Sequence, residues 1–187
     1  MMDDLSLATL LEHIIERLAA APAKSQDPWR TPALATLDTQ GLPTLRTVVL
    51  RGYRERCLEF HTDTRSAKWD ELSKVHQSAW CFWDPETKEQ LRIQGACTLH
   101  HRDAASQEAW KRLPAHTQAS YGVDSAPKTS IQDADSFDFI GDLQDTHFGV
   151  IRSTAFSMDW LKLGRPKHKR AQFTWLQDTW QSTWLIP

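Results

Sequence analysis

From residue 33 onward the chain is a succession of short apolar segments, rich in β-branched residues and separated by tight turns. This pattern limits the fold more than any other feature. The segments expected to be strands are 33–37, 44–53, 57–62, 78–83, 90–101, 148–153, 156–163, 170–175 and 180–186. Short strands joined so closely are typical of an antiparallel barrel, which we expect to close on itself so that no strand edge stays exposed. The pattern is not the strand–helix alternation of a doubly wound sheet, so we predict a β-rich α+β fold.

Helical signals precede and interrupt these strands. Residues 6–20 carry leucine and isoleucine at helical spacing, with charged residues on the opposite side, and Pro22 ends the helix. Ser66 stands where it can cap a second, short helix. Residues 103–112 are expected to form a third helix, which ends before Pro114.

Two further local features are expected. Gly95 interrupts one of the strands, and an isolated glycine inside a strand indicates a β-bulge. The stretch 122–145 is polar, acidic and without periodicity, so we expect it to be a loop. A chain of 187 residues is long enough for one domain with a well-buried core and too short for two of full size. We therefore expect a single domain over residues 1–187.

Charge and composition exclude several classes of protein. The formal net charge is −2 and the isoelectric point is near 6.4, whereas a nucleic-acid binder needs a basic surplus to neutralise phosphates. No apolar run approaches the roughly 20 residues of a membrane span, and Asp3 and Asp4 stand where a signal peptide would carry basic residues. The three cysteines lack the spacing of a metal site, and their odd number suits free thiols. These features predict a cytoplasmic protein without a metal site.

The segment GLPTLRTVVLRGY, residues 41–53, places two arginines in an otherwise apolar strand. Arg46 and Arg51 are five residues apart, so in a strand without a bulge they point to opposite faces. A buried guanidinium needs a partner, because burying a charge alone is costly. The two arginines either hold a partner of opposite charge or reach solvent from an edge strand, and this segment alone leaves both possibilities open.

The segment FHTDTRSAKWDEL, residues 60–72, combines the end of a strand with the start of a helix. Arg65, Ser66 and Lys68 place two cations, a hydroxyl and free backbone N–H groups at the first helical turn. This combination suits a phosphate group. A simple capped helix with solvated basic side chains is the alternative.

The segment EQLRIQG carries three polar side chains on one face of a strand, namely those of Gln90, Arg92 and Gln94. A glutamine amide both donates and accepts hydrogen bonds, so it can bind the polar edge of a heterocycle. The polar outer face of a half-buried strand is the alternative.

In their order, spacing and strand–helix context, these three segments resemble the flavin-binding half of the pyridoxamine 5'-phosphate oxidase-like split barrels. The resemblance rests on G-x-P-x-x-R-T-V-V-L-R (41–51), F-H-T-D-x-R-S-x-K (60–68) and Q-x-R-I-x-G (90–95), and it covers residues 29–99. It implies an antiparallel split β-barrel with peripheral helices, FMN as the cofactor, and a homodimer with FMN at the subunit interface. The C-terminal strands within 147–187 are expected to contribute to that dimer.

The resemblance also implies which residues hold the phosphate end of FMN. Arg46 and Lys68 match the residues that bind the phosphate, with Ser66 nearby. His61 and Thr62 match a strand-end pair that contacts the phosphate and the ribityl chain.

Other residues are implied at the ring end of FMN. Thr47, Val48 and Val49 would lie against the isoalloxazine ring, and Arg51 stands where the oxidases carry a lysine near the substrate phosphate.

A last group of residues would reach FMN from the second subunit, namely Gln90, Trp160 and Arg170. The excess of tryptophan supports a dimer independently, because nine tryptophans offer more large aromatic surface than one small barrel readily buries.

Two departures from the oxidase pattern speak against vitamin B6 oxidation. Residues 116–127 stand where the oxidases hold the pyridoxal phosphate group, and they offer only Tyr121 and some hydroxyls. Trp184 stands where the oxidases carry an arginine shortly before the final proline, and an aromatic ring cannot replace a bidentate phosphate partner. Both departures leave the residues for FMN binding intact.

Three functional hypotheses follow from these observations. The leading one is an FMN-dependent oxidoreductase, in which the cofactor performs the hydride or electron chemistry. The second is a non-catalytic binder or carrier of FMN or of another planar cofactor such as haem, because a fold does not fix a function. The third is vitamin B6 oxidation itself. The sequence indicates no catalytic residue and no particular substrate.

Overall fold

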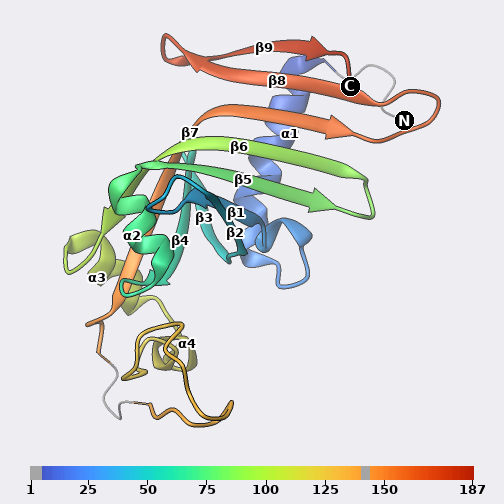
Figure 1. Cartoon of the computed structure of the whole chain (residues 1–187). Coiled ribbons are helices and arrows are strands. Elements are labelled where there is room, and N and C mark those ends of the chain that lie inside the picture. Colours follow the sequence, from blue (N-terminus) through green and yellow to red (C-terminus); the bar gives the residue numbers. More distant parts are fainter. Residues whose placement is uncertain (1–5, 140–143) are drawn as a thin grey trace.

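The computed structural model describes residues 6–139 and 144–187 and consists of one antiparallel sheet with helices around it (Figure 1). The strands are β1 Ala33–Leu37, β2 Pro43–Thr47, β3 Leu50–Arg54, β4 Cys57–Asp63, β5 Gln77–Asp84, β6 Glu89–His100, β7 Phe148–Lys162, β8 Lys169–Leu176 and β9 Thr179–Leu185. The helices are α1 Leu7–Ala20, α2 Ala67–Lys74, α3 Ala104–Lys111 and α4 Ala115–Ala119, with short 3-10 turns at Ala21–Ala23 and Pro28–Arg30. The β-rich α+β class expected from the sequence is confirmed.

The strands follow the order β2-β1-β5-β6-β7-β4-β3, and β8 and β9 extend the sheet from β7. β2 and β3 follow each other in the chain but lie at the two ends of this order, and no pairing joins them in the described part of the sheet. The barrel is therefore split and open, as in an antiparallel split β-barrel. The expectation that the barrel closes on itself is wrong.

The opening has its cause in the segment 44–53, which forms two strands and not one. β2 pairs with β1, whereas β3 pairs with β4 at the other end of the sheet. Between them Val48 donates its backbone N–H to the carbonyl of Pro32 over 3.0 Å and buries its side chain in the core. A run of β-branched residues does not distinguish such a crossing from a continuous strand.

β7 joins the two halves of the split barrel. Its residues 148–154 pair with β4, and its residues 157–162 pair with β8, while β6 runs along the other edge. The two strands expected at 148–153 and 156–163 are thus one continuous strand of 15 residues.

The bulge predicted at Gly95 is confirmed. The register between β6 and β7 shifts between Gln94 and Gly95. A Cβ atom at this position would lie 2.3 Å from Ser153 Oγ and 3.1 Å from the carbonyl oxygen of Thr154. Only glycine therefore allows the two backbones to approach this closely.

α1 covers the inner side of the sheet and runs behind β5 to β9 in Figure 1. Ser6 begins this helix by accepting a hydrogen bond from the Thr9 backbone N–H. The fully buried side chains that join α1 to the sheet are Leu10, Ile14, Leu18, Trp29, Trp80, Phe82 and Trp160. Helix and sheet thus share one core.

Arg17 connects α1 to the β5–β6 hairpin through ion pairs. Its guanidinium forms ion pairs with Asp84 and Glu89 and lies 4.1 Å from the centre of a Trp29 ring. Burial alone would raise the pKa of Asp84, but hydrogen bonds from Arg17 and from Thr87 hold this pKa at about 2. Asp84 is therefore ionised and paired at neutral pH.

α3 begins with a reciprocal capping box between Asp103 and Ser106. The chain then forms α4, which the sequence did not predict, and continues without helix or strand through residues 122–139, apart from a single bridge between Val123 and Phe139. The expectation of a loop at 122–145 holds for its described residues, and 140–143 lie outside them. Figure 1 places this excursion at the end of the molecule opposite to β8 and β9.

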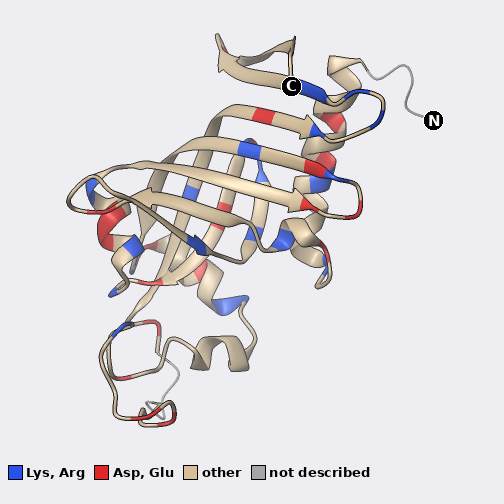
Figure 2. Cartoon of the chain, turned by 45° about the vertical axis from the view of Figure 1, so that its right-hand side comes forward, with Lys and Arg blue, Asp and Glu red and all other residues tan. Residues whose placement is uncertain are grey.

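Basic and acidic positions alternate over the helices and strands, and neither sign collects on one side in Figure 2. No helix within residues 6–139 and 144–187 has the length and apolar character that crossing a membrane requires.

Candidate functional site

A polar cradle is made of Thr62, Ser66 and Lys68, at the end of β4 and the start of α2, together with Arg46 of β2. Thr62 Oγ1 accepts a hydrogen bond from Lys68 Nζ over 2.9 Å and lies 3.0 Å from Ser66 Oγ. Ser66 holds the N-cap position of α2, but its hydroxyl makes no capping hydrogen bond. No carboxylate among the described residues forms an ion pair with Lys68. The alternative of a simple capped helix with solvated side chains therefore does not apply.

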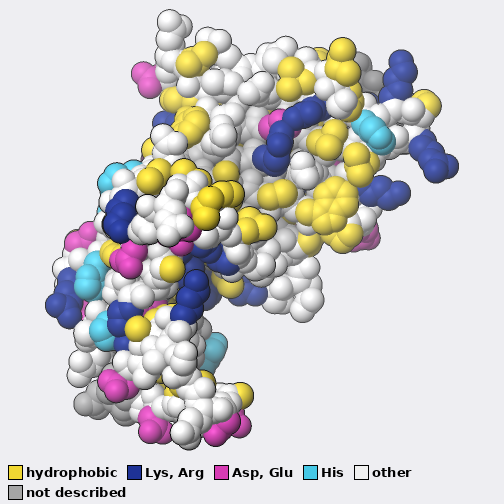
Figure 3. All heavy atoms as spheres, in the orientation of Figure 1, with side chains coloured by type: hydrophobic (Ala, Val, Ile, Leu, Met, Phe, Trp, Pro, Cys, Tyr) yellow, Lys and Arg dark blue, Asp and Glu magenta, His cyan; other side chains and the backbone are white. Residues whose placement is uncertain are grey.

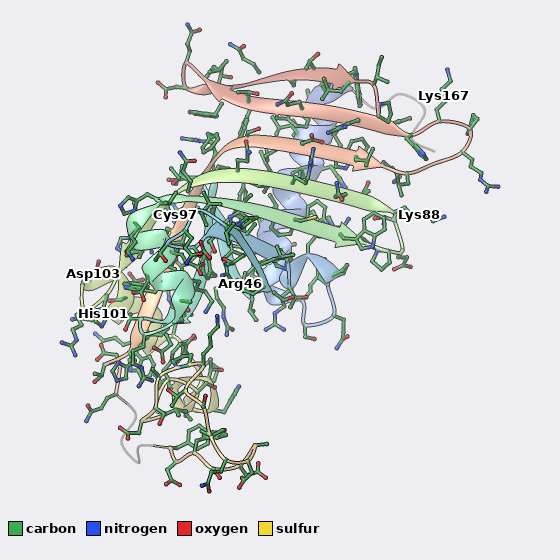
Figure 4. The ribbon with its side chains drawn as sticks, in the orientation of Figure 1. Arg46, Lys88, Cys97, His101, Asp103 and Lys167 are labelled. Carbon is green, nitrogen blue, oxygen red and sulfur yellow. The ribbon has the colours of Figure 1, made fainter. Side chains whose placement is uncertain are left out.

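Arg46 reaches this cradle from β2. Its guanidinium donates hydrogen bonds to the hydroxyls of Thr36 and Thr44 and, over 2.8 Å, to the carboxylate of Glu71 in α2. The Arg46 side chain is 22% exposed, and Figure 4 labels it where β2 passes α2. Arg46 is thus a partly buried, fixed cation and not a solvated arginine on a sheet edge.

The cations of the cradle influence one another. Burial lowers the pKa of Lys68, and the nearby charge of Arg46 lowers it further. Burial would raise the pKa of Glu71, but hydrogen bonds from Thr36, Thr44 and Arg46 lower it overall, so Glu71 is ionised. A bound anion would stabilise both cations through charge-assisted hydrogen bonds.

The residues present fit a phosphate monoester. A guanidinium has five N–H donors and an ammonium has three, and the bonds described engage three donors of Arg46 and one of Lys68. The first backbone N–H groups of a helix also lack partners inside the helix, and here they belong to the start of α2. Donors of both kinds suit the single phosphate group of FMN.

His61 and Thr62, predicted as a pair, lie on opposite faces of β4. The His61 ring packs edge-on against Phe148 with ring centres 4.9 Å apart, and its Nε2 lies 3.4 Å from Glu59. Arg51 is close enough for its charge to contribute to lowering the pKa of His61, after the larger effect of burial. The structure therefore places His61 and Arg51 together and outside the cradle, and their contacts with FMN stay predictions.

Thr47 is the last residue of β2, and Val48 and Val49 form the crossing to β3. Thr47 is exposed, Val49 is half-buried and Val48 belongs to the core. Their place beside the isoalloxazine ring stays a prediction.

Gln90, Arg92 and Gln94 share the outer face of β6, as their spacing predicted. Arg92 and Gln94, with Leu45 of β2, line a cavity of about 310 Å³ on this side of the sheet. Large exposed hydrophobic side chains lie around it, namely Leu37, Leu45, Trp83 and Phe156, which together we call the apolar outer face. In Figure 3 hydrophobic side chains gather over the strands in the upper half of the view.

Trp160 and Arg170 do not converge in the structure. Trp160 is fully buried in the core of its own chain. Arg170 pairs with Leu161 of β7, and both side chains point to the face of the sheet opposite Trp160. The Arg170 guanidinium forms an ion pair with Asp159 over 2.7 Å. The burial of Trp160 speaks against its reaching the FMN of a second subunit, whereas Arg170 stays available on the outer face.

Three residues of the site were missed in the sequence, namely Thr36, Thr44 and Glu71. Thr44 shares the face of Arg46 because the two are two residues apart in one strand, and Glu71 follows Lys68 by about one helical turn. Both spacings can be read from the sequence, so Thr44 and Glu71 could have been predicted as site residues. Thr36 could not be found without the pairing of β1 with β2, which places it opposite Thr44.

Comparison with known proteins points to one family. The family model described as pyridoxamine 5'-phosphate oxidase, FMN-binding domain, matches residues 8–101, which contain the cradle and Gln90. Among sequence relatives, the pyridoxine/pyridoxamine 5'-phosphate oxidase of Chelativorans sp. (strain BNC1) is 37% identical over 76 residues, which are 41% of this chain and 36% of the relative. That of Chromohalobacter salexigens is 44% identical over 62 residues, 33% and 29% of the two chains. The chain thus spans about a third of the length of these curated relatives.

Solved structures resemble the chain over almost its whole length. A pyridoxamine 5'-phosphate oxidase-related, FMN-binding protein from Nostoc punctiforme PCC 73102 has a TM-score of 0.79 at 28% identity, covering 98% of this chain and 100% of that one. PhzG from Burkholderia lata 383 has a TM-score of 0.75, covering 99% and 95%, and at 19% identity this is a likeness of fold alone. The cofactor of this domain is FMN, which the cradle fits. By its family match and its split-barrel fold, the chain belongs to the pyridoxamine 5'-phosphate oxidase-related family of FMN-binding proteins.

Proposed function

We propose that this chain is an FMN-dependent oxidoreductase whose substrate is not a vitamin B6 phosphate. The observation that carries the proposal is the cradle, in which Arg46 and Lys68 lie together with uncommitted donors. Bound FMN supplies hydride or electron transfer, and the protein supplies binding, orientation and electrostatics.

The chain's own residues then have distinct tasks. Arg46 and Lys68 hold the phosphate of FMN, and the hydroxyls of Thr62 and Ser66 add neutral hydrogen-bond partners. Glu71 fixes the Arg46 guanidinium from α2, so that little side-chain freedom is lost when the phosphate binds.

The dimer with FMN at the subunit interface belongs to the same proposal. Soluble monomers rarely expose large contiguous apolar patches, yet the apolar outer face leaves Leu45 71% and Trp83 42% exposed. A second copy would cover this face and bring its own Gln90 and Arg170 toward the FMN of the first. Such contacts are reciprocal about a two-fold axis.

Two observations support a substrate other than a vitamin B6 phosphate. Tyr121, the candidate in the segment 116–127, packs edge-on against Phe148 at 5.0 Å and against Trp110 at 6.1 Å. Burial raises the pKa of Tyr121 to about 12, so its phenol stays neutral, and residues 116–127 carry no lysine or arginine beside it. Trp184 is 43% exposed and offers no cation in place of the missing arginine.

The decisive experiment is to purify the full chain, record its absorption spectrum, release the cofactor and assay turnover. FMN with oxidation of NAD(P)H or of another donor would support the proposal. FAD in place of FMN, or no flavin bound in excess FMN, would overturn it. FMN without turnover on any donor would favour the non-catalytic carrier. Oxidation of pyridoxamine 5'-phosphate at about 1 per second or faster, an ordinary enzymatic rate, would overturn the choice of substrate.

A further inference from the structure

Arg65 stands next to Ser66 of the cradle, where the sequence suggested a cation for a phosphate group, but its guanidinium is bound to other groups. It forms an ion pair with Asp63, with Nη2 2.8 Å and Nε 3.1 Å from the carboxylate oxygens. It also donates hydrogen bonds to the backbone carbonyls of Val123 over 2.8 Å and of Asp124 over 2.7 Å. These bonds engage four of the five N–H donors of the side chain. Arg65 therefore connects the β4–α2 turn to the start of the excursion 122–139.

The β4–α2 turn holds this connection in place. Asp63 accepts a second hydrogen bond from the backbone N–H of Arg65 over 2.7 Å, and the two side chains are only 13% and 19% exposed and neutralise each other. Thr64 donates its backbone N–H to the carbonyl of His147 over 2.9 Å, where the chain returns to β7. The chain thus leaves and re-enters the barrel at the turn that carries the cradle. In Figure 1 the excursion lies below α2 and β4.

Lys128 is the one basic side chain of residues 122–139. It lies in a turn that Thr129 closes with hydrogen bonds to the carbonyl of Ala126, 3.1 Å from its backbone nitrogen and 2.7 Å from its hydroxyl. The Lys128 side chain is exposed and forms no hydrogen bond or ion pair with any residue that the structure describes. Its charge contributes to lowering the pKa of Lys68, after the larger effects of burial and of Arg46. The Lys128 ammonium group is therefore within electrostatic reach of the cradle.

The charges of the cradle do not by themselves balance a phosphate monoester. Arg46 and Lys68 carry two positive charges, and Glu71, which is hydrogen-bonded to Arg46, offsets one of them. A phosphate monoester carries about 1.5 to 2 negative charges at neutral pH. Lys128 supplies a further positive charge that no ion pair among the described residues neutralises. A cation brought by the excursion would thus complete the charge balance of the bound phosphate.

We propose that Arg65 is a positioning residue, which holds the first part of the excursion, residues 122–129, beside the cradle, so that Lys128 faces the FMN phosphate and the excursion slows the release of FMN. The observation that carries the inference is the pair of carbonyl bonds from Arg65, together with the bond between Thr64 and His147. The inference rests on the proposed FMN site and extends it to a segment outside the residues 8–101 that the family model matches. Because the excursion is already fixed, it loses little freedom when FMN binds.

The test compares the release of FMN with the release of riboflavin, which has the same ring system and no phosphate. Flavin fluorescence after dilution of the loaded full chain measures both dissociation rates, at low ionic strength because salt screens exposed charges. Arg65→Gln and Lys128→Ala should each speed FMN release roughly tenfold, as expected for the loss of one hydrogen bond to a charged group. Riboflavin release should change less than twofold. Arg65→Lys keeps the charge beside Asp63 but lacks the fork that binds both carbonyls, so its rate should lie between those of Arg65→Gln and the natural chain.

Matched variants serve as controls. Arg54→Gln makes the same change as Arg65→Gln at a side chain that is 88% exposed, and Lys111→Ala removes an exposed charge of α3. Both should change FMN release less than twofold. An FMN dissociation rate within twofold of the natural chain in Arg65→Gln or in Lys128→Ala, or an equal increase for riboflavin, would overturn the inference. Because the Lys128 side chain is exposed, Lys128→Ala tests the inference even if Arg65→Gln does not fold.

Limited digestion with trypsin follows the excursion directly. Bound FMN should slow cleavage after Lys128 in the natural chain, and it should slow this cleavage less in Arg65→Gln. Cleavage after Lys24, an exposed lysine between α1 and β1, should not depend on FMN. Cleavage after Lys128 that FMN leaves unchanged would overturn the inference while leaving the FMN site intact, whereas a natural chain that binds no FMN would refute the proposed function as well.

Discussion

Lys68 Nζ donates a hydrogen bond to Thr62 Oγ1 over 2.9 Å, and this contact joins the end of β4 to the first turn of α2. The two residues are six positions apart, so the local chain alone can form this half of the cradle. Arg46 arrives from β2 and is held by Glu71, 25 positions away. The affinity for FMN should therefore depend on one local and one long-range contact.

Arg46→Ala and Lys68→Ala should each weaken FMN binding by about 1.5–3 kcal/mol, the range for hydrogen bonds to charged groups. The reason is that each variant removes one of the two cations of the cradle. Fluorescence titration of the apoprotein with FMN measures the effect. Lys74→Ala, at the exposed end of α2, is the matched control and should change the affinity little. Equal small losses at all three positions would mean that the phosphate binds elsewhere.

Leu45→Asp should convert the proposed dimer into a monomer. Leu45 is 71% exposed on the apolar outer face, and a buried, unpaired carboxylate at a subunit interface is costly. Sedimentation over a dilution series, with and without FMN, would detect the change. Bound FMN should strengthen the natural dimer, because a ligand bound only by the dimer stabilises it by mass action.

The control for this variant is Ile131→Asp, which places the same charge at an exposed apolar position in the excursion 122–139. This variant should remain dimeric. A natural chain that is monomeric at every concentration, yet keeps FMN tightly bound, would contradict the shared site.

Asp84→Asn should destabilise the protein by about 2 kcal/mol at neutral pH and remove part of its acid sensitivity. The folded pKa of Asp84, about 2, lies below its ordinary value of 3.8. The stabilisation is therefore complete above about pH 4 and is lost as the pH falls from there toward 2. A folded pKa that lies one pH unit below the unfolded pKa corresponds to about 1.4 kcal/mol of stability. Denaturant unfolding from pH 7 down to pH 2 measures both effects.

Glu86→Gln is the control for Asp84, because it makes the same carboxylate-to-amide change in the same hairpin at an exposed position. It should leave the free energy of unfolding and its pH dependence nearly unchanged. If the free energy of unfolding depended on pH in the same way in Asp84→Asn and in the natural chain, the ion pair between Arg17 and Asp84 would not hold α1 in place.

Gly95→Ala should destabilise the sheet by about 1–3 kcal/mol, the usual cost of overpacking. The added methyl group would meet Ser153, whose hydroxyl is fixed by Ser78 over 2.8 Å and by the Trp80 indole over 3.1 Å. Thermal unfolding measures the loss. Gly52→Ala is the control, because a Cβ there meets only Glu59 at an ordinary distance of 3.9 Å. If Gly95→Ala were as stable as the natural chain, the bulge would be able to shift and make room for the methyl group.

The sequence by itself determined the features that depend on neighbouring residues. The period of two places Gln90, Arg92 and Gln94 on one face of β6, and helical spacing places Leu10, Ile14 and Leu18 on one side of α1. The cradle half formed by Thr62, Ser66 and Lys68 also lies within seven residues of chain. Such features need no knowledge of which elements pair.

Only the tertiary structure decided where the split of the barrel lies and what holds Arg46. The crossing at Val48 and Val49 exists because β2 pairs with β1 whereas β3 pairs with β4. The alternation of side chains along a strand does not show which strands will pair. The same holds for Trp160, which is fully buried in the core cluster that contains Leu10 and Ile14 of α1. Side-chain period fixes which residues share a face, but long-range packing decides which face is buried, and with it which charges meet.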